Sequence, residues 1–314
     1  MHKLIPQTNF ETTMKIELFG IPLDLGASRR GVDMGPSAIR IACIAQALTR
    51  IGHEVVDCGD IAVVSPEVQS IENSKLKYLP EIAKSVTNLA DAVTQTMARG
   101  NFPLVLGGDH SIAVGTVSGV ARALQAKKKR LGIIWIDAHA DMNTHETTLS
   151  GNIHGMPFAA LLGKGTPELA GVGGDFQKIR PEDAVLVGAR NLDPKEQNLV
   201  RESGISVYTM EDIDRRGIVD VMMEAIEIAT LKADCLHVSL DMDGLDPQVA
   251  PGVGTPVRGG LTYREAHTAM ELISGCHCLC SLEVVEVNPI LDIRNTTAEV
   301  AVEMVESALG KRII

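Results

Sequence analysis

Short apolar runs alternate with helical patterns along most of this 314-residue chain. The periodicity predicts strands at residues 15–21, 54–58, 103–107, 132–137, 184–188, 205–209, 235–241 and 278–286. Apolar strands that alternate with helices form parallel sheets, which helices cover on both faces. The sequence contains no linker rich in Pro, Ser or Gly and no break in composition. We therefore expect an α/β fold in one domain.

Two of the predicted helices have clear ends. The first covers residues 36–51, with Pro in its first turn and Gly52 directly after it. The second covers residues 75–99 and stops at Gly100. Both patterns predict continuous helices.

Three predicted strands end in residue types that bind metals. Residues 107–110 read GGDH, residues 137–141 read DAHAD, and residues 241–243 read DMD. Alternate side chains of an extended segment point to one side, and burying so much charge is costly unless a cation is present. In open parallel sheets, ligands bind at the carboxyl ends of the strands. The sequence thus predicts a metal centre with two ions, and its oxygen-rich ligands suit Mn or Mg.

Composition excludes several other classes of function. The formal charge is −11, and the one basic run, residues 127–130, has no accompanying aromatic residues, so we expect no nucleic-acid partner. No apolar stretch is long enough to span a membrane. The first residues have no signal-peptide pattern, which predicts a cytoplasmic protein.

Six cysteines are present, and Cys276, Cys278 and Cys280 alternate within the last predicted strand. Structural zinc sites usually take pairs of ligands from separate segments, and no second Cys pair is present. Buried free thiols on a strand face are therefore favoured over zinc. The lack of a disulfide framework indicates a reducing compartment.

The motifs GGDH (107–110), DAHAD (137–141), SGNIHG (150–155) and DMDGLDP (241–247), in this order, resemble the ureohydrolase, or arginase, family. The resemblance runs from Gly20 to about Leu309 and includes GVDMGPSAIR (31–40) and EVVEVNP (283–289). It implies a three-layer α/β/α sandwich on an eight-stranded, mostly parallel sheet. Residues 14–314 would form a single ureohydrolase domain, and residues 1–13 an N-terminal extension.

The resemblance also implies two Mn²⁺ per subunit and assigns their ligands by motif. One ion would be held by His110, Asp137, Asp141 and Asp241, and the other by Asp137, His139, Asp241 and Asp243. Asp137 and Asp241 would bridge the two ions. Asp109 and Asp246 are expected to brace loops instead, and His237 is expected to be a packed core residue.

The same resemblance implies a substrate. Asn143, Thr148 and Ser150 resemble the arginase residues that receive the α-carboxylate of the amino acid, a group that agmatine lacks. Asp193 and Glu196 resemble the acidic pair that meets its α-amino group. The substrate implied is L-arginine, hydrolysed to L-ornithine and urea through a metal-bridging hydroxide.

Four residues receive roles in this reaction by resemblance. Glu286 would accept the guanidinium group, and Thr255 would line the same pocket. Asp141 would pass a proton to the leaving nitrogen, and His154 would exchange protons with solvent.

Three alternatives differ in chemistry. Another ureohydrolase, such as an agmatinase or guanidinobutyrase, would carry a different loop at residues 143–150. A metal-dependent binding protein or pseudoenzyme would have lost a ligand or the shuttle histidine. A deacetylase of related fold would use one zinc and another ligand pattern. The chain resembles the bacterial arginases, so we expect a homo-oligomer, either a trimer or a hexamer.

Overall fold

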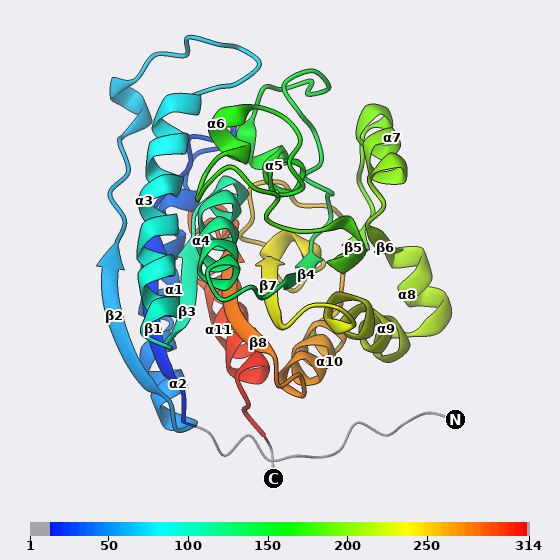
Figure 1. The fold of residues 1–314 in the computed structure, drawn as a ribbon. Helices are drawn as coiled ribbons and strands as arrows, with labels where there is room; N and C mark the ends of the chain where they lie inside the picture. Colours follow the sequence, from blue (N-terminus) through cyan, green and yellow to red (C-terminus); the bar gives the residue numbers. More distant parts are fainter. Residues whose placement is uncertain (1–12, 313–314) are drawn as a thin grey trace.

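All eight predicted strands lie in one sheet of the computed structural model, which describes residues 13–312 (Figure 1). The strands are β1 (Lys15–Ile21), β2 (Glu54–Asp60), β3 (Phe102–Gly107), β4 (Leu131–Ile136), β5 (Ala184–Ala189), β6 (Ser206–Thr209), β7 (Cys235–Asp241) and β8 (Leu279–Val285). Their order is β2-β1-β3-β8-β7-β4-β5-β6, and every neighbouring pair is parallel. The predicted eight-stranded α/β fold is therefore confirmed. The extension predicted at residues 1–13 lies outside the described residues except for residue 13, and its division from a domain at 14–314 stays a prediction.

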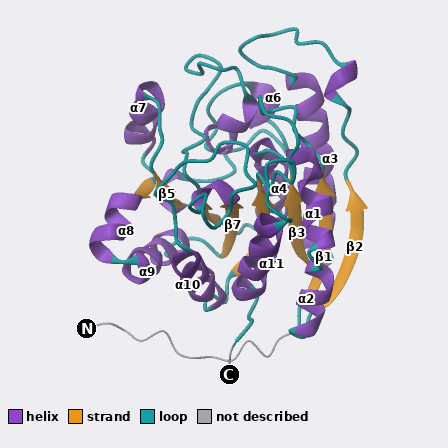
Figure 2. Cartoon of the chain, turned by 180° about the vertical axis from the view of Figure 1, so that it is seen from behind, coloured by secondary structure: helices purple, strands orange, loops and turns teal. Residues whose placement is uncertain are grey.

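Helices cover both faces of the sheet, as opposite views show (Figures 1 and 2). The α-helices are α1 (Gly35–Ile41), α2 (Ile44–Arg50), α3 (Leu79–Ala98), α4 (Ala113–Gln125), α5 (Pro157–Leu161), α6 (Pro167–Ala170), α7 (Pro194–Ser203), α8 (Met210–Arg216), α9 (Ile218–Thr230), α10 (Tyr263–Ser274) and α11 (Thr296–Ala308). Helices α1, α2, α8, α9, α10 and α11 pack on one face, and α3, α4, α5 and α6 on the other. None of the helices in residues 13–312 is both long enough and apolar enough to cross a membrane.

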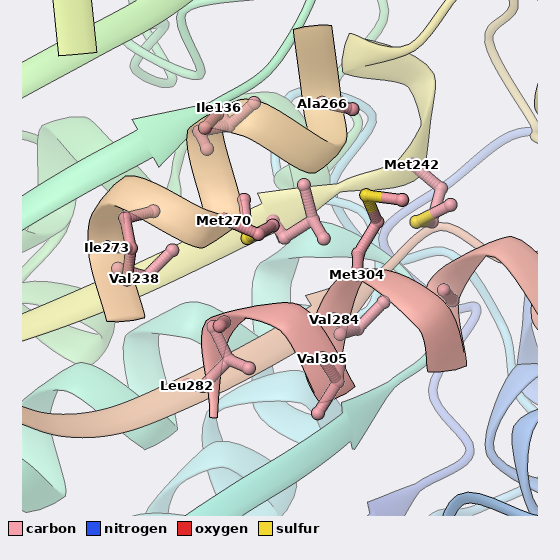
Figure 3. Packing of buried hydrophobic residues seen from close by; sticks show 14 of the residues in the cluster. Ile136, Val238, Met242, Ala266, Met270, Ile273, Leu282, Val284, Met304 and Val305 are labelled. Atoms are coloured by element: carbon pink, nitrogen blue, oxygen red, sulfur yellow. The ribbon is translucent and has the colours of Figure 1, made fainter. Parts of the chain in front are cut away.

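Two separate apolar cores follow from the alternation of side chains along the strands. Leu104 of β3 packs in the core beneath α10 and α11, whereas its neighbour Val105 packs in the core beneath α3 and α4. Figure 3 shows part of the first core, where Met270 of α10 and Met304 of α11 meet side chains from the sheet. A sheet buried on both faces explains why its strands are apolar at nearly every position.

Three local predictions differ from the structure. The helix predicted at 36–51 is two helices, because Cys43 adopts a left-handed backbone conformation (φ 66°) between α1 and α2. The helix predicted from residue 75 begins only at Leu79, after Tyr78, which is also left-handed (φ 54°). Strand β8 begins at Leu279, so Cys276 and Cys278 lie in the preceding turn rather than on the strand.

Candidate metal centre and active site

Four adjacent strands in the middle of the sheet, β3, β8, β7 and β4, lead into the residues of the candidate site. Ile136 of β4 pairs with Leu240 of β7, so Asp137 and Asp241 follow at neighbouring strand ends. Glu286 follows the end of β8, which pairs with β7. The register of the parallel strands therefore brings together carboxylates that lie about 50 to 150 positions apart in the sequence.

His110 lies at the centre of the first group of possible ligands. Its Nδ1 atom is 3.0 Å from Oδ2 of Asp141, 3.0 Å from Oδ2 of Asp241 and 3.2 Å from Oδ2 of Asp137. All four side chains are buried. His110 Nδ1 and Asp141 Oδ2 have no hydrogen-bond partner. Buried polar atoms are rarely left in this state, so these two atoms are available to an ion.

His139 lies at the centre of a second group. Its Nδ1 atom is 3.2 Å from Oδ2 of Asp243 and 3.4 Å from Oδ1 of Asp137. Asp137 thus directs one oxygen towards each group, as a bridging carboxylate would. His110 with Asp137 and Asp141, and Asp137 with His139 and Asp243, each offer ligand atoms within 4.8 Å of one another. The structure brings all six predicted ligands together.

The electrostatics of this cluster favour a positive charge at its centre. Burial, together with the charge of Asp137, raises the pKa of Asp141 to about 6. Burial and neighbouring carboxylates also raise the pKa of Asp241 and of Asp243. Burial would lower the pKa of His139, but the surrounding carboxylates outweigh it and raise that pKa to about 12. Carboxylates that oppose one another's ionisation in this way suit a divalent cation.

Two residues that were not predicted to belong to the site, Trp135 and Ser239, hold His110 in place. The Trp135 ring stacks on the His110 ring with centroids 4.1 Å apart, and its Nε1 donates to Asp137 Oδ2 at 2.9 Å. Ser239 Oγ lies 2.8 Å from His110 Nε2 and donates to Glu283 Oε1 at 2.8 Å. This contact leaves Nδ1 of His110 facing the cluster. Both residues could have been predicted from the alternation of side chains along a strand, since each lies two positions before a predicted ligand.

His237, predicted to be a core residue, is fully buried but belongs to a polar network. Its Nδ1 lies 2.8 Å from Ser281 Oγ, and its Nε2 lies 3.4 Å from Glu283 Oε1. The network continues through Ser239 to His110. His237 therefore helps to hold the predicted ligand His110 through this network, in addition to packing in the core.

The GGDH segment requires a close approach of two loops. A Cβ atom at Gly108 would lie 1.8 Å from the carbonyl oxygen of Leu23, so only glycine fits this position. Asp109 accepts hydrogen bonds from the amides of Ser111 at 3.0 Å and Gly26 at 2.7 Å. Burial raises the pKa of Asp109 to about 7. As predicted, this carboxylate braces the loops around His110.

The segment that carries Asp243 is held by Arg190, a residue that was not predicted to belong to the site. The Arg190 guanidinium donates to the carbonyl oxygens of Gly188, Asp243, Gly244, Leu245 and Val257, over 2.7 to 3.3 Å. Asp246 secures the next part of this loop, where it accepts from the amides of Gln248 and Gly259, as predicted. An arginine directly after a strand carries no motif that would have marked its role.

Glu286 and Asp141 both have left-handed backbone conformations, with φ of 64° and 51°. Such strain in non-glycine residues concentrates at functional sites. Glu286 Oε1 accepts from the backbone N–H of His110 at 3.1 Å and lies 2.9 Å from His154 Nδ1, while Oε2 is buried without a partner. Burial would lower the pKa of His154, but Glu286 outweighs it and raises that pKa to about 9.

A cavity of about 240 Å³ opens above the carboxylate cluster. Its lining consists of His110, His139, Asp141, Asn143, His154, Gly155, Asn191, Asp193, Glu196, Asp241, Asp243, Thr255 and Glu286. Thr255 Oγ1 donates to Asp243 Oδ2 at 2.9 Å, and Asn143 Nδ2 donates to Asp193 Oδ2 at 2.9 Å. Burial and the charge of Asp141 raise the pKa of Glu196 to about 8.

Two predicted substrate residues do not line this cavity. Thr148 is buried, and its Oγ1 accepts from the amide of Gly151 at 2.9 Å. Ser150 is exposed, and its Oγ accepts from the amide of Asn152 at 3.2 Å. Their roles towards substrate stay predictions. Asn191 also lines the cavity, although no sequence motif marks it.

Comparison with known proteins agrees with this geometry. The model of the arginase family matches residues 14–310. An arginase from Bacillus caldovelox is 52% identical over 300 residues, which cover 95% of this chain and 99% of the relative. The native structure of the Bacillus caldovelox arginase at pH 5.6 superposes with a TM-score of 0.92 and covers 96% of this chain and all of that one. An arginase from Entamoeba histolytica in complex with L-ornithine is 31% identical, with a TM-score of 0.88 over 95% of this chain and 99% of that one. The chain belongs to the arginase family.

Proposed function

We propose that this protein hydrolyses L-arginine to L-ornithine and urea. The observation that carries the proposal is the cavity itself, whose floor is a cluster of possible metal ligands and whose wall carries further acidic groups. No Lys or Arg occurs among its lining residues. A guanidinium group and an α-amino group are both cationic, so this cavity suits the two cationic groups of arginine.

We further propose that two Mn²⁺ ions bind here. The residues that would hold them are His110, Asp137, His139, Asp141, Asp241 and Asp243, with Asp137 and Asp241 shared. When bound, such ions act as Lewis acids and make water nucleophilic at neutral pH. The buried, partnerless atoms of His110 and Asp141 support this assignment.

Glu286 would orient the reacting group. Glu286 lines the cavity, and its Oε2 has no hydrogen-bond partner, so this oxygen can accept a guanidinium N–H in a charge-assisted bond. Its other oxygen is already held by the His110 amide and by His154. A carboxylate fixed in this way holds the guanidinium carbon in one position, which contributes to rate through proximity.

Two side chains would move protons. Asp141, whose Oδ2 is directed at the ligand cluster, would pass a proton to the leaving nitrogen through its other carboxylate oxygen. His154 lines the cavity and, with its raised pKa, holds a proton at neutral pH that it can exchange with solvent.

The other end of the cavity would select an α-amino acid. Asp193 and Glu196 would receive the α-amino group, and Asn143 would donate to the α-carboxylate. Asn143 is bonded to Asp193, so one contact couples the two recognition elements.

The test is urea release by the manganese-loaded protein, with L-arginine and agmatine in parallel. We expect strong activity with arginine and little with agmatine. The variant Asn143→Ala should raise KM for arginine and leave the weak agmatine reaction nearly unchanged. Preference for agmatine would retain the metal assignment but refute the role of Asn143, Thr148 and Ser150. Activity with neither substrate would refute the proposed reaction.

We also propose, from the resemblance to bacterial arginases, a cytoplasmic homo-oligomer of three or six subunits. Light scattering in solution checks the assembly, and a mass equal to one subunit would refute it.

A further inference from the structure

A close pair of thiols lies at the other end of β8 from Glu286. Cys276 and Cys278 occupy the turn between α10 and β8, and their Sγ atoms are 2.9 Å apart. Both are partly buried against the core on the α10 and α11 side. The metal centre lies beyond the carboxyl end of the same strand, so the proposed hydrolysis does not use these thiols.

The backbone holds the two sulfur atoms in this arrangement. The amide of Cys276 donates to the carbonyl of Ile273 at 2.8 Å, at the end of α10. The carbonyl of Cys278 accepts from the amide of Leu236 at 2.8 Å, at the start of β7. Each cysteine is thus anchored to a different element, and the two side chains meet between those anchors.

Cys276 also has the environment of a reactive thiol. The Cys278 thiol lowers the pKa of Cys276 to about 7 against the effect of burial, aided by the backbone amides of Cys278 and Leu279. A thiolate is the nucleophile in disulfide exchange. The Cys280 thiol likewise lowers the pKa of Cys235 to about 7. By contrast, burial raises the pKa of Cys58, and Cys43 Sγ donates to the carbonyl oxygen of Ile41 at 3.5 Å.

We propose that Cys276 and Cys278 form a redox-active dithiol that small-molecule disulfides convert reversibly into an intramolecular disulfide. The Cys276 thiolate attacks the external disulfide, forms a mixed disulfide and releases one thiolate. The Cys278 thiol then loses its proton and attacks the Cys276 sulfur, which releases the second thiolate. The protein loses two electrons and two protons, and the external disulfide gains both electrons to become two thiols.

The short spacing favours reversibility. Only one residue separates the two cysteines, and a disulfide that closes so small a ring departs from relaxed geometry. Strained or accessible disulfides have higher potentials and are the labile ones. A permanent structural crosslink is therefore not expected.

The experiment treats the full-length, manganese-loaded protein with glutathione disulfide, blocks the remaining thiols with iodoacetamide and maps the tryptic peptides by mass spectrometry. Trypsin leaves Cys276, Cys278 and Cys280 in one peptide, residues 265–294, and Cys235 in another, residues 233–258. We expect the first peptide to lose the mass of two hydrogens, to carry no glutathione on Cys276 or Cys278, and to regain its thiols with dithiothreitol.

Single variants separate the two thiols. In Cys278→Ser, Cys276 has no resolving partner and should retain glutathione as a stable mixed disulfide. In the control Cys58→Ser, the internal crosslink should form as in the wild type. Stable glutathione adducts on both Cys276 and Cys278 of the wild type would overturn the proposal.

Two other results would also overturn it. One is an unmodified Cys276–Cys278 peptide under conditions in which Cys43 and Cys58 react. The other is a crosslink that joins Cys235 to Cys280 while Cys276 and Cys278 remain thiols. Urea release is not the readout, so failure of this proposal is distinct from failure of the proposed function.

Discussion

Replacing Arg190 should weaken both the fold and the metal centre, although this residue is not among the predicted ligands. In Arg190→Met the side chain keeps its apolar stem but loses every donor. The carbonyl oxygens that lose their partner include that of Asp243, at 2.7 Å, and that of Gly244, at 3.1 Å. The first belongs to a predicted ligand and the second to its neighbour. The substitution therefore tests whether the loop needs an external clamp.

The magnitude follows from the number of bonds and their shared donor. A hydrogen bond to a charged group contributes about 1.5–3 kcal/mol. Five bonds from one guanidinium are not additive, because the loop relaxes in part when they are lost together. We expect the free energy of unfolding to fall by about 3–5 kcal/mol. Substitution of a residue that holds metal ligands in place typically weakens metal affinity by about 10–100-fold. We expect the manganese affinity of Arg190→Met to fall by that factor.

The single tryptophan provides the assay. Trp135 stacks on His110 and donates to Asp137, so its fluorescence should respond to both unfolding and manganese binding. Denaturant unfolding of the metal-free protein gives stability, and a manganese titration gives affinity. Arg216→Met is the matched control, since that guanidinium pairs with Glu224 at the surface and its loss should cost at most about 1 kcal/mol.

Two further variants test the same clamp. Gly260→Ala would place a Cβ atom 2.5 Å from Arg190 Nη2, and 2.6 and 2.7 Å from backbone atoms of Leu245 and Asp246. It should therefore disturb both the Arg190 guanidinium and the loop that this guanidinium holds, and weaken manganese binding in the same direction. Arg190→Lys should fall between wild type and Arg190→Met, because an ammonium group lacks the planar fork. If Arg190→Met binds manganese and unfolds as the wild type does, the clamp argument is refuted.

Three further predictions concern single side chains. Asp141→Asn should nearly abolish urea release and weaken manganese binding, and wild-type turnover would contradict its role. Trp135→Phe retains the stacking on His110 but removes the N–H bond to Asp137, so manganese affinity should fall by about tenfold; an unchanged titration, followed calorimetrically, would contradict this. Hydrogen bonding by Arg99 lowers the pKa of Glu17 to about 2 from 4.5. The contribution of the ionised Glu17 carboxylate to stability is therefore present above pH 4.5 and is lost as pH falls towards 2. Glu17→Gln should lower the free energy of unfolding by about 1–3 kcal/mol at pH 7. The difference from wild type should disappear near pH 2, and a difference independent of pH would contradict the assignment.

The sheet could be predicted from the sequence because its strands are buried on both faces. A run such as residues 131–136 has no polar position, and few structures other than a covered parallel strand accommodate it. The ligands could be predicted for a related reason. They follow the strand ends directly, and parallel strands bring those ends to one edge, so sequence position alone limits where they can lie.

Features set by loops and backbone strain could not be predicted in this way. The break at Cys43 has no Gly or Pro to mark it, and tertiary packing places an ordinary residue in a left-handed conformation. The prediction that this helix begins at residue 75 is wrong for the same reason, because Tyr78 is left-handed and α3 begins after it. The turn that holds Cys276 and Cys278 differs from the predicted strand because the alternation of apolar residues begins before the first residue of β8.

Arg190 shows why a list of ligands does not specify a metal centre. The predicted ligands share a pattern because each must point at an ion, but the groups that hold them share none. Ser239 orients an imidazole through its hydroxyl, Trp135 holds a carboxylate through its ring N–H, and Arg190 binds only backbone carbonyls. Each uses a different chemistry, so no single residue type or spacing identifies the set. What they have in common is a contact to a ligand or its peptide, which only the three-dimensional arrangement reveals. The affinity of this centre should therefore depend on residues that a motif does not include, and the Arg190 titration measures how much.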